Sequence, residues 1–491
     1  MRVLLTIILS AMISGCMLGP NFHSPPKPPV RSFTAHPMPK KTAATPAAGK
    51  AGKSQQFVNG QDIPADWWYL FHSKELDCLV RRGLAHSPTI TAAYAALRQA
   101  QEAVNVQVGN LLFPAVNASL TGQRQKFSDA TIGTPGSSLF NLFNASVSVA
   151  YTLDVFGASR RQIESLRAQV DYQQFQLMAA YITLSANIIT TAVTVASYQE
   201  QIKATKDLIR IYGKQLDIMK KQFDLGGISL QTVLTQETLV DQTRATLPPL
   251  QLGLAQQRHA LDVLVGDFPE HPLPEIHLSA ITLPEHLPVS IPSNLVRQRP
   301  DVRAAEATMH AACANVGVAT ANLFPQFTIT GNYGWEATSP GQLFSAASRV
   351  WSYGGGITQP IFHGGALFAA RRQAIAAYDQ AAAQYHQTVL TAFQNVADTL
   401  RALQMDARTL RERKNAEIAA KRNLTLTQQQ YFLGGVSYLS LLITEQQYHQ
   451  TLIATIQAEA LRYNDTAALF QALGGGWWNK SWCVKECLNA A

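Results

Sequence analysis

The sequence predicts a mainly α-helical chain that also contains four β-strands of the membrane type, built as two copies of one plan. Three observations lead to this fold class. Two stretches of 68 residues, 158–225 and 366–433, contain no proline and one glycine between them. Two pairs of shorter segments alternate between apolar and polar residues. The motif QFDLGGIS at Gln222–Ser229 returns 208 residues later as QYFLGGVS at Gln430–Ser437, with five of eight residues identical.

The first 15 residues read as a secretion signal. Arg2 precedes the apolar stretch Val3–Ile13, which is too short to span a bilayer. The stretch runs into Ser-Gly-Cys16, which resembles the bacterial lipoprotein processing box, where the cysteine is acylated and becomes the mature N-terminus. Two acyl chains give stable anchoring, and Met17 in place of an aspartate is consistent with transfer to the outer membrane. The alternative is an ordinary cleaved signal with a chance cysteine.

Residues 16–64 are predicted to form an extended tether after the acylated Cys16. Eight prolines lie between Pro20 and Pro46, and proline disrupts both helices and central strands. The first packed residues are expected at Trp67 and Trp68.

The remainder divides into a first repeat at 65–280, a second at 281–476 and a C-terminal tail at 477–491. Besides the eight-residue motif, Phe113-Pro114 recurs as Phe324-Pro325. Each repeat is expected to contain a helix, two strands, a very long helix, a turn and a second long helix. Ser87 with Pro88 starts the first helix of the first repeat, and Pro300 with Asp301 starts its counterpart.

Strict alternation identifies the strands. One strand has apolar residues at odd positions from Phe143 to Val155 and mostly polar residues between them, and its partner contains Val116, Ala118 and Leu120. The second repeat supplies two more strands, around Phe327–Trp335 and Trp351–Ile361. Such segments match membrane β-barrel strands, with lipid on one side and water on the other. A four-stranded sheet over a soluble core is the alternative.

The long helices favour the membrane interpretation. At 1.5 Å per residue, 68 residues reach about 100 Å, several times the length of a globular helix. Apolar residues recur at heptad-like spacing, and the other faces are rich in Ala, Gln, Thr and Ser. A closed bundle of such helices would have a hydrated bore. Apolar positions of the two helices include Leu166, Val170, Leu177, Leu184 and Ile188, and Val389, Phe393, Val396, Leu400 and Leu403.

Composition limits the possible functions. Charged residues make up 15% and hydrophobic residues 47% of the chain, which suggests extensive subunit or membrane contact. The net charge of +8 comes from scattered basic residues, so no nucleic acid partner is expected. Cys78 and Cys313 are expected to be buried as small apolar residues, and Cys483 and Cys487 are candidates for a disulfide.

No enzyme signature is present: the sequence contains no HExxH, GxSxG or P-loop motif. The glycine triplets Gly354–Gly356 and Gly474–Gly476 lack the following Lys and Ser or Thr of a phosphate loop. We therefore expect no catalysis, no cofactor and no metal.

Four strands are too few to close a membrane barrel, since even the smallest needs about eight. An open edge in lipid would leave unpaired peptide groups. Several copies of the chain must therefore share one barrel if the strands lie in the membrane.

The chain resembles the TolC-like outer membrane factors, specifically the lipoprotein branch called the NodT family. The resemblance covers nearly everything after Cys16 and includes the Leu-Gly-Gly turns; its other motifs are Asp66-Trp67-Trp68, RQRPDVR at Arg297–Arg303 and LGGGW at Leu473–Trp477. It implies a homotrimer whose twelve-stranded β-barrel continues as a long periplasmic α-helical barrel.

The function implied by the resemblance is that of the outer-membrane channel of a tripartite efflux system. Such a channel passively exports small molecules, drugs or other toxic compounds, which a proton-driven inner-membrane pump delivers through a periplasmic adaptor. Two alternatives remain: the outer channel of a protein or peptide secretion system, and a non-channel lipoprotein that spans the periplasm as a scaffold.

The resemblance also assigns site residues. It places two glycine pairs at the periplasmic hairpin tips, where an adaptor docks and where positive φ is needed: Gly226, Gly227, Gly434 and Gly435. Acidic residues that line the closed aperture in the family fall at positions without acids here: Thr232, Thr235, Ser440 and Ile443. We therefore expect a gate of polar and apolar contacts, with more distant candidates for charge near the entrance in Asp224, Glu237, Asp241 and Glu445.

Overall fold

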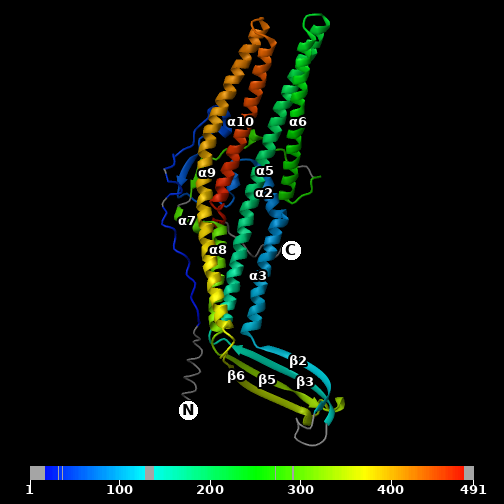
Figure 1. Cartoon of the computed structure of the whole chain (residues 1–491), viewed down its shortest axis with the longest axis vertical. Helices are drawn as coiled ribbons and strands as arrows, with labels where there is room; N and C mark the ends of the chain where they lie inside the picture. The colour runs from blue at the N-terminus through cyan, green and yellow to red at the C-terminus, as the bar shows by residue number, and fades with distance from the viewer. Residues whose placement is uncertain are drawn as a thin grey trace. The chain divides into compact units, whose positions relative to one another are not determined.

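The computed structural model describes residues 17–30, 32–35, 37–127, 138–270, 273–289 and 292–479. It consists largely of helices (Figure 1), which are α2 (Lys74–His86), α3 (Pro88–Leu112), α5 (Ala158–Asp224), α6 (Leu230–Val265), α7 (Pro292–Gln298), α8 (Pro300–Ala321), α9 (Ala366–Phe432) and α10 (Tyr438–Ala472). The strands are β1 (Gln56–Asn59), β2 (Ala115–Phe127), β3 (Ser138–Leu153), β4 (His286–Val289), β5 (Gln326–Ala337) and β6 (Arg349–Thr358). Short 3₁₀ turns are η1 (Pro46–Gly52), η2 (Trp67–Phe71), η3 (Leu278–Ala280), η4 (Pro340–Gln342), η5 (Ala346–Ser348) and η6 (Trp477–Asn479).

The chain divides into two compact units. The first comprises Met1–Pro25, Ala96–Gln174 and Ala304–His386, and the second comprises Pro26–Ala95, Phe175–Arg303 and Gln387–Ala491. The predicted long helices are confirmed, since α5 and α9 each contain 67 residues.

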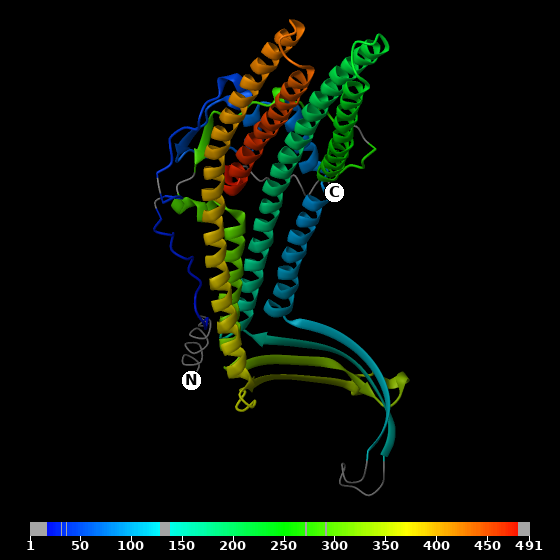
Figure 2. The same cartoon turned by 45° about the horizontal axis from the view of Figure 1, so that its top comes forward.

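The first unit contains a four-stranded antiparallel sheet in the order β2-β3-β5-β6. Figure 2 shows the strands curving together along their length. The register aligns the apolar residues of neighbouring strands: Val147 faces Ala118 on one side and Tyr333 on the other. Polar residues align in the same way, because Ser146 faces Ser119. The predicted alternation is therefore one apolar face and one polar face across all four strands.

The segment directly after Cys16 packs in the first unit. Arg161, at the start of α5, is buried and donates hydrogen bonds to the carbonyl oxygen of Leu18 at 3.1 Å and to Oδ1 of Asn21 at 2.7 Å. Phe22 stacks on the ring of His310, with centroids 4.4 Å apart. The prediction of an extended tether over the whole of 16–64 is therefore wrong at its start. Cys16 itself lies outside the described residues.

The tether prediction is also wrong at its other end, in the second unit. Strand β1 pairs in parallel with β4, 230 residues away along the chain. Arg462 of α10 is fully buried and donates to the carbonyl oxygens of Ala51 at 2.6 Å and Lys53 at 2.9 Å. These hydrogen bonds join residues about 410 positions apart in the chain and hold the segment in place. The amino-acid composition of the segment does not reveal them. Burial lowers the pKa of Arg462 to about 10, which leaves it charged at neutral pH.

Two further differences concern the start of the first repeat. Helix α2 precedes Pro88, where the first helix of the repeat was predicted to start; its N-cap is Ser73, whose hydroxyl accepts from the amide of Leu76. Cys78 on α2 is exposed, so its predicted burial is wrong, because it lies on the face of the helix opposite the buried Leu76, Leu79 and Val80. Cys313 on α8 is buried, as predicted. Cys483 and Cys487 lie outside the described residues.

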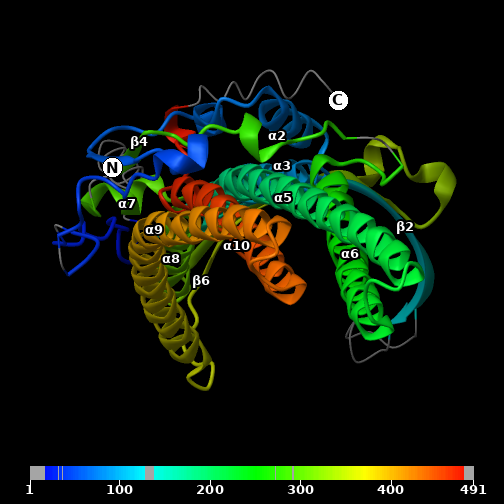
Figure 3. The ribbon, with the colours of Figure 1, turned by 90° about the horizontal axis from the view of Figure 1, so that it is seen from above.

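In the second unit α10 packs between α5 and α9 (Figure 3). Gln457 of α10 donates to Oε1 of Gln201 in α5 at 3.1 Å, and Thr455 donates to the carbonyl oxygen of Arg413 in α9 at 3.4 Å. Of the described helices, α5 contains one 18-residue stretch apolar enough to cross a membrane by composition, and 56% of that stretch is buried. This degree of burial is typical of a helix that packs against other helices.

Candidate functional site

The two hairpin tips have the same backbone geometry. Gly226 and Gly434 both adopt a φ of 73°, and the amides of the glycines that follow donate 2.8 Å hydrogen bonds back to the carbonyl oxygens of Gln222 and Gln430. This is the left-handed helix end that glycine favours. The predicted need for positive φ holds for the first glycine of each pair but is wrong for Gly227 and Gly435.

Each returning helix begins with a serine cap. The hydroxyl of Ser229 accepts from the amide of Thr232 at 3.4 Å, and that of Ser437 accepts from the amide of Ser440 at 3.3 Å. The hydroxyls of Thr232 and Ser440 also bond their capping serines at 3.0 Å. Two of the four positions at which the family resemblance places aperture acids thus carry hydroxyls engaged in capping.

The other predicted gate positions face outward from the chain. Thr235 is exposed, and Ile443 is 58% exposed. Asp224 is exposed, and Asp241 is exposed and pairs with Arg244 at 3.1 Å. In the described part of the chain no group of three or more His, Cys, Asp or Glu side chains is arranged to hold a metal ion.

A polar network, which sequence reasoning missed, joins the second hairpin to the first. The Tyr438 hydroxyl of α10 donates toward Oε1 of Gln236 in α6 at 2.9 Å and Oε1 of Gln215 in α5 at 3.2 Å. Nε2 of Gln215 donates to Oε1 of Glu445 at 2.9 Å. A tyrosine and a glutamate on the apolar side of a helix are the sequence signal that would have located this network.

Glu445 lies inside this network and is only 3% exposed. Burial raises the pKa of Glu445, while the amides of Gln215 and Gln428 offset part of the effect. The structure thus argues against Glu445 as an exposed charge at an entrance. Glu237, 208 positions earlier, stays on the surface and pairs with Lys220 at 3.3 Å.

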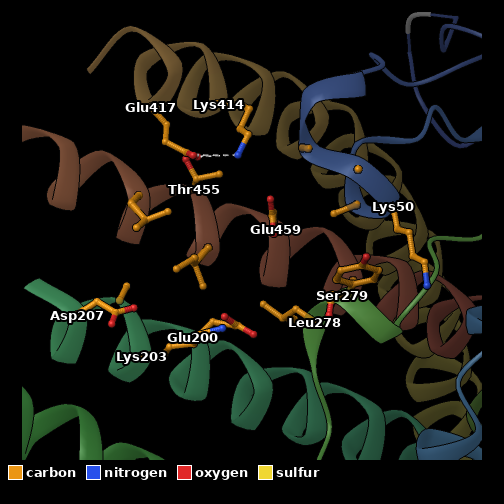
Figure 4. Close-up of a pocket in the computed structure, with 17 residues that line it drawn as sticks. Lys50, Glu200, Lys203, Asp207, Leu278, Ser279, Lys414, Glu417, Thr455 and Glu459 are labelled. Carbon is orange, nitrogen blue, oxygen red and sulfur yellow. Dashed lines mark hydrogen bonds and ion pairs between the residues drawn. The ribbon is translucent and has the colours of Figure 1, made fainter. Parts of the chain in front are cut away.

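A separate polar cavity of about 610 Å³ lies among α5, α9, α10, η1 and η3 (Figure 4). Lys414 and Glu417 of α9 form an ion pair at 2.9 Å on one wall. Glu459 of α10 points into the cavity, and burial raises its pKa to about 7, with Lys414 opposing the shift. Both basic and acidic side chains line the cavity, so its charge favours neither an anionic nor a cationic ligand.

Long helices returning through glycine tips, joined in sequence to an antiparallel sheet with one apolar face, define the class of outer-membrane channel proteins. The sequence profile of the outer membrane efflux protein family matches residues 79–267 and 291–475. The chain therefore belongs to the outer membrane efflux protein family, and it is an outer-membrane protein.

Individual relatives agree with this assignment. The chain is 28% identical over 485 residues to the probable efflux pump outer membrane protein TtgC of Pseudomonas putida, covering 98% of this chain and 97% of TtgC. It is also 28% identical over 487 residues to nodulation protein T of Rhizobium leguminosarum, covering 96% and 92%. The solved structure of the outer-membrane channel OprN superposes with a TM-score of 0.83 at 27% identity, covering 94% of this chain and 100% of OprN. The predicted resemblance to TolC-like channels of the NodT family is confirmed.

Proposed function

We propose that three copies of this chain form an outer-membrane channel that passively exports small molecules, drugs or other toxic compounds. A proton-driven inner-membrane pump would deliver these molecules through a periplasmic adaptor. The observation that carries the proposal is the four-stranded sheet β2-β3-β5-β6, whose outer strands have no further strand partner in the described part of the chain.

The argument for a trimer begins at these two sheet edges. An unpaired edge in lipid costs several kcal/mol for each unsatisfied peptide group. Four strands per chain cannot curve into a closed barrel, whereas three chains supply twelve, and pairing β2 of one copy with β6 of the next removes every edge. The apolar face then contacts lipid and the Ser and Asn face contacts water.

The two repeats, 65–280 and 281–476, support an internal duplication. Each contains a helix followed by two strands, a 67-residue helix and a shorter returning helix. Three copies of two hairpins provide twelve helices, α5, α6, α9 and α10 from each chain, which would continue the barrel as a periplasmic α-helical barrel. Residues 1–15 would be removed as a signal, and Cys16 would carry the lipid.

The adaptor-docking tips would be formed by the two glycine pairs at the helix turns, Gly226 with Gly227 and Gly434 with Gly435.

The gate is a separate part of the proposal. The absence of acids at Thr232, Thr235, Ser440 and Ile443 supports a gate of polar and apolar contacts. We expect single-channel current in a planar bilayer to be insensitive to millimolar divalent cations added on the periplasmic side, because none of these four aperture positions carries a carboxylate. Strong block by divalent cations would refute this gate.

The same bilayer measurement tests the channel itself. Purified full-length protein should form trimers and show discrete single-channel conductance, whereas a scaffold that spans the periplasm would show none.

A deletion strain then distinguishes the two transport alternatives, export of small molecules and secretion of proteins or peptides. Loss of the protein should increase intracellular retention of a fluorescent drug while leaving secreted proteins unchanged, and the opposite pattern would favour a secretion channel.

A further inference from the structure

A groove of about 600 Å³ lies near the tips of the second unit, between α5 of the first hairpin and α9 and α10 of the second. Its walls are largely apolar, and its lining residues include Ile218, Met219 and Leu441. This volume falls in the range of sites for drug-sized molecules. The polar cavity of Figure 4 is a different space with different lining residues.

One buried carboxylate at this groove lacks a full set of partners. Glu445 is 97% buried; its Oε1 accepts from Gln215, and the amide of Gln428 lies near enough to favour the charged carboxylate, but Oε2 is buried and accepts no hydrogen bond among the described residues. A buried carboxylate oxygen left unpaired costs more than a neutral one. A ligand that supplied a donor at this point would remove that cost.

The charged residues of the groove indicate which kind of hydrogen-bond donor a ligand would bring to Glu445. Among the described residues that line it, Glu445 is the one carboxylate, and none is Lys, Arg or His. The uncharged polar groups are glutamine amides, the hydroxyl of Thr425 and the phenols of Tyr431 and Tyr438. A protonated amine would therefore meet one carboxylate and no positive charge, and a hydrogen bond between an ammonium and a carboxylate is stronger than one between neutral groups.

We infer that this groove binds a small organic amine, with its ammonium group at Oε2 of Glu445 and its apolar body against Ile218, Met219 and Leu441. The bound molecule would contact α5 on one side and α9 and α10 on the other. It would thus fasten the first hairpin to the second. A ligand shifts an equilibrium toward the arrangement that it binds more tightly, so the amine favours the hairpin arrangement seen here.

The binding follows from the groove alone, whereas its effect on ion current rests on the proposed channel function. Calorimetry on the trimer in non-ionic detergent at neutral pH tests the binding with three indole probes of similar size. Tryptamine carries the ammonium, tryptophol is neutral, and indole-3-acetate is an anion. We expect tryptamine to bind at least about tenfold more tightly than tryptophol, and indole-3-acetate to bind no more tightly than tryptophol. Equal affinity for tryptamine and tryptophol, or no binding of tryptamine, overturns the site.

Variants on one helix provide the matched comparison. Glu445→Gln should reduce the affinity for tryptamine to that for tryptophol, whereas Glu459→Gln, which alters the partly buried acid of the separate cavity, should leave it unchanged. Retained tryptamine affinity in Glu445→Gln overturns the assignment. If Glu445→Gln does not yield trimers, Ile218→Trp fills the groove from an exposed position and leaves the carboxylate in place. Unchanged tryptamine binding in Ile218→Trp overturns the site as well.

Bilayer recordings then test the coupling to opening. Tryptamine should lower the open probability of the wild-type channel and have no effect on Glu445→Gln. Binding by calorimetry without an effect on current would refute the coupling between hairpins. A protein that binds tryptamine but shows no current under any condition would refute the channel function and leave the amine site standing.

Discussion

The two hairpin tips share one backbone and differ in what their returning helices contact. Gly226 and Gly434 have the same φ of 73°, and both returning helices start at a serine cap. At equivalent positions the first hairpin has Leu230, 52% exposed, where the second has Tyr438, which bonds to α5 and α6. A duplicated turn can therefore keep its geometry while its two copies acquire different neighbours.

The side chains around the tips also differ in polarity, because those of the second tip are more apolar than those of the first. Asp224 of the first tip corresponds to Phe432, which is 92% exposed, and Thr235 corresponds to Ile443. Apolar side chains this exposed in one chain generally mark a contact surface. We expect the second tips to meet one another at the aperture and the more polar first tips to favour docking.

The largest effect should come from fixing the second tips to one another. Cysteines are best placed at Leu433, which is 88% exposed, and at Leu225, which is 87% exposed, because Ser229 and Ser437 are needed as caps. Cross-linked Leu433→Cys trimers should lose export of a fluorescent drug in cells, and cross-linked Leu225→Cys trimers should retain more of it. Export that persists with confirmed cross-links at Leu433 would contradict opening at the second tips.

A smaller effect is expected from removing one hydroxyl of the network between hairpins. Tyr438→Phe leaves Oε1 of the buried Gln236 without its tyrosine donor, at a cost of about 1–2 kcal/mol, whereas Oε1 of Gln215 still accepts from Nε2 of Gln236. Amide hydrogen exchange at the start of α10 should accelerate correspondingly. Leu230→Ala, the matched change in the first hairpin, should alter exchange in α6 by less than about 0.5 kcal/mol. Equal effects at both hairpins would remove the asymmetry.

The glycines provide a test in which the two tips should behave alike. Gly226→Ala and Gly434→Ala force a side chain into positive φ, which costs about 1 kcal/mol each. Gly227→Ala and Gly435→Ala serve as controls, because these residues do not adopt positive φ and an added Cβ would lie 3.3 Å and 3.5 Å from the nearest carbonyl oxygen. Amide exchange at the turns measures the difference, and a penalty at only one tip would show that the turns are not equivalent.

The smallest effect concerns pH. Burial raises the pKa of Glu445 above its ordinary value of 4.5, so protonation favours the folded hairpins. Its contribution is fully present below about pH 4.5 and is lost as the pH rises through the folded-state pKa. Glu445→Gln should therefore flatten the pH dependence of exchange protection in α10, whereas Glu237→Gln removes only a surface pair and should not. An unchanged profile in Glu445→Gln would contradict the burial argument.

The elements that the sequence predicted best are those defined by local pattern. The absence of glycine and proline sufficed for α5 and α9, and alternation sufficed for the sheet, because both signals act within a few residues. Pairing of β1 with β4 joins segments 230 residues apart, and no local pattern encodes it. Several partners of Arg161 and Arg462 are backbone carbonyl groups, which every residue possesses, so the burial of these two side chains could not be predicted from a local pattern either.

The residues of the candidate site divide in the same way, into those that a local motif predicts and those that depend on neighbours distant in sequence. The tip glycines were found because the motif repeats, and their caps follow from the serines in that motif. Glu445 was taken for an entrance charge because its surroundings come from α5 and α9, which are remote in sequence. A glutamate that interrupts an apolar helix face requires the packed neighbours before its exposure can be assigned.

The attachment of residues 18–21 to Arg161 has a mechanical consequence. With the proposed lipid on Cys16, any pull on that lipid would reach the folded protein through Leu18, whose amide donates to the carbonyl oxygen of Phe156 and whose carbonyl oxygen accepts from Arg161. The load therefore enters at the junction between β3 and α5. Residues beyond Pro25 would then be spared, so the contacts of Arg462 with Ala51 and Lys53 would bear no tension from the proposed anchor.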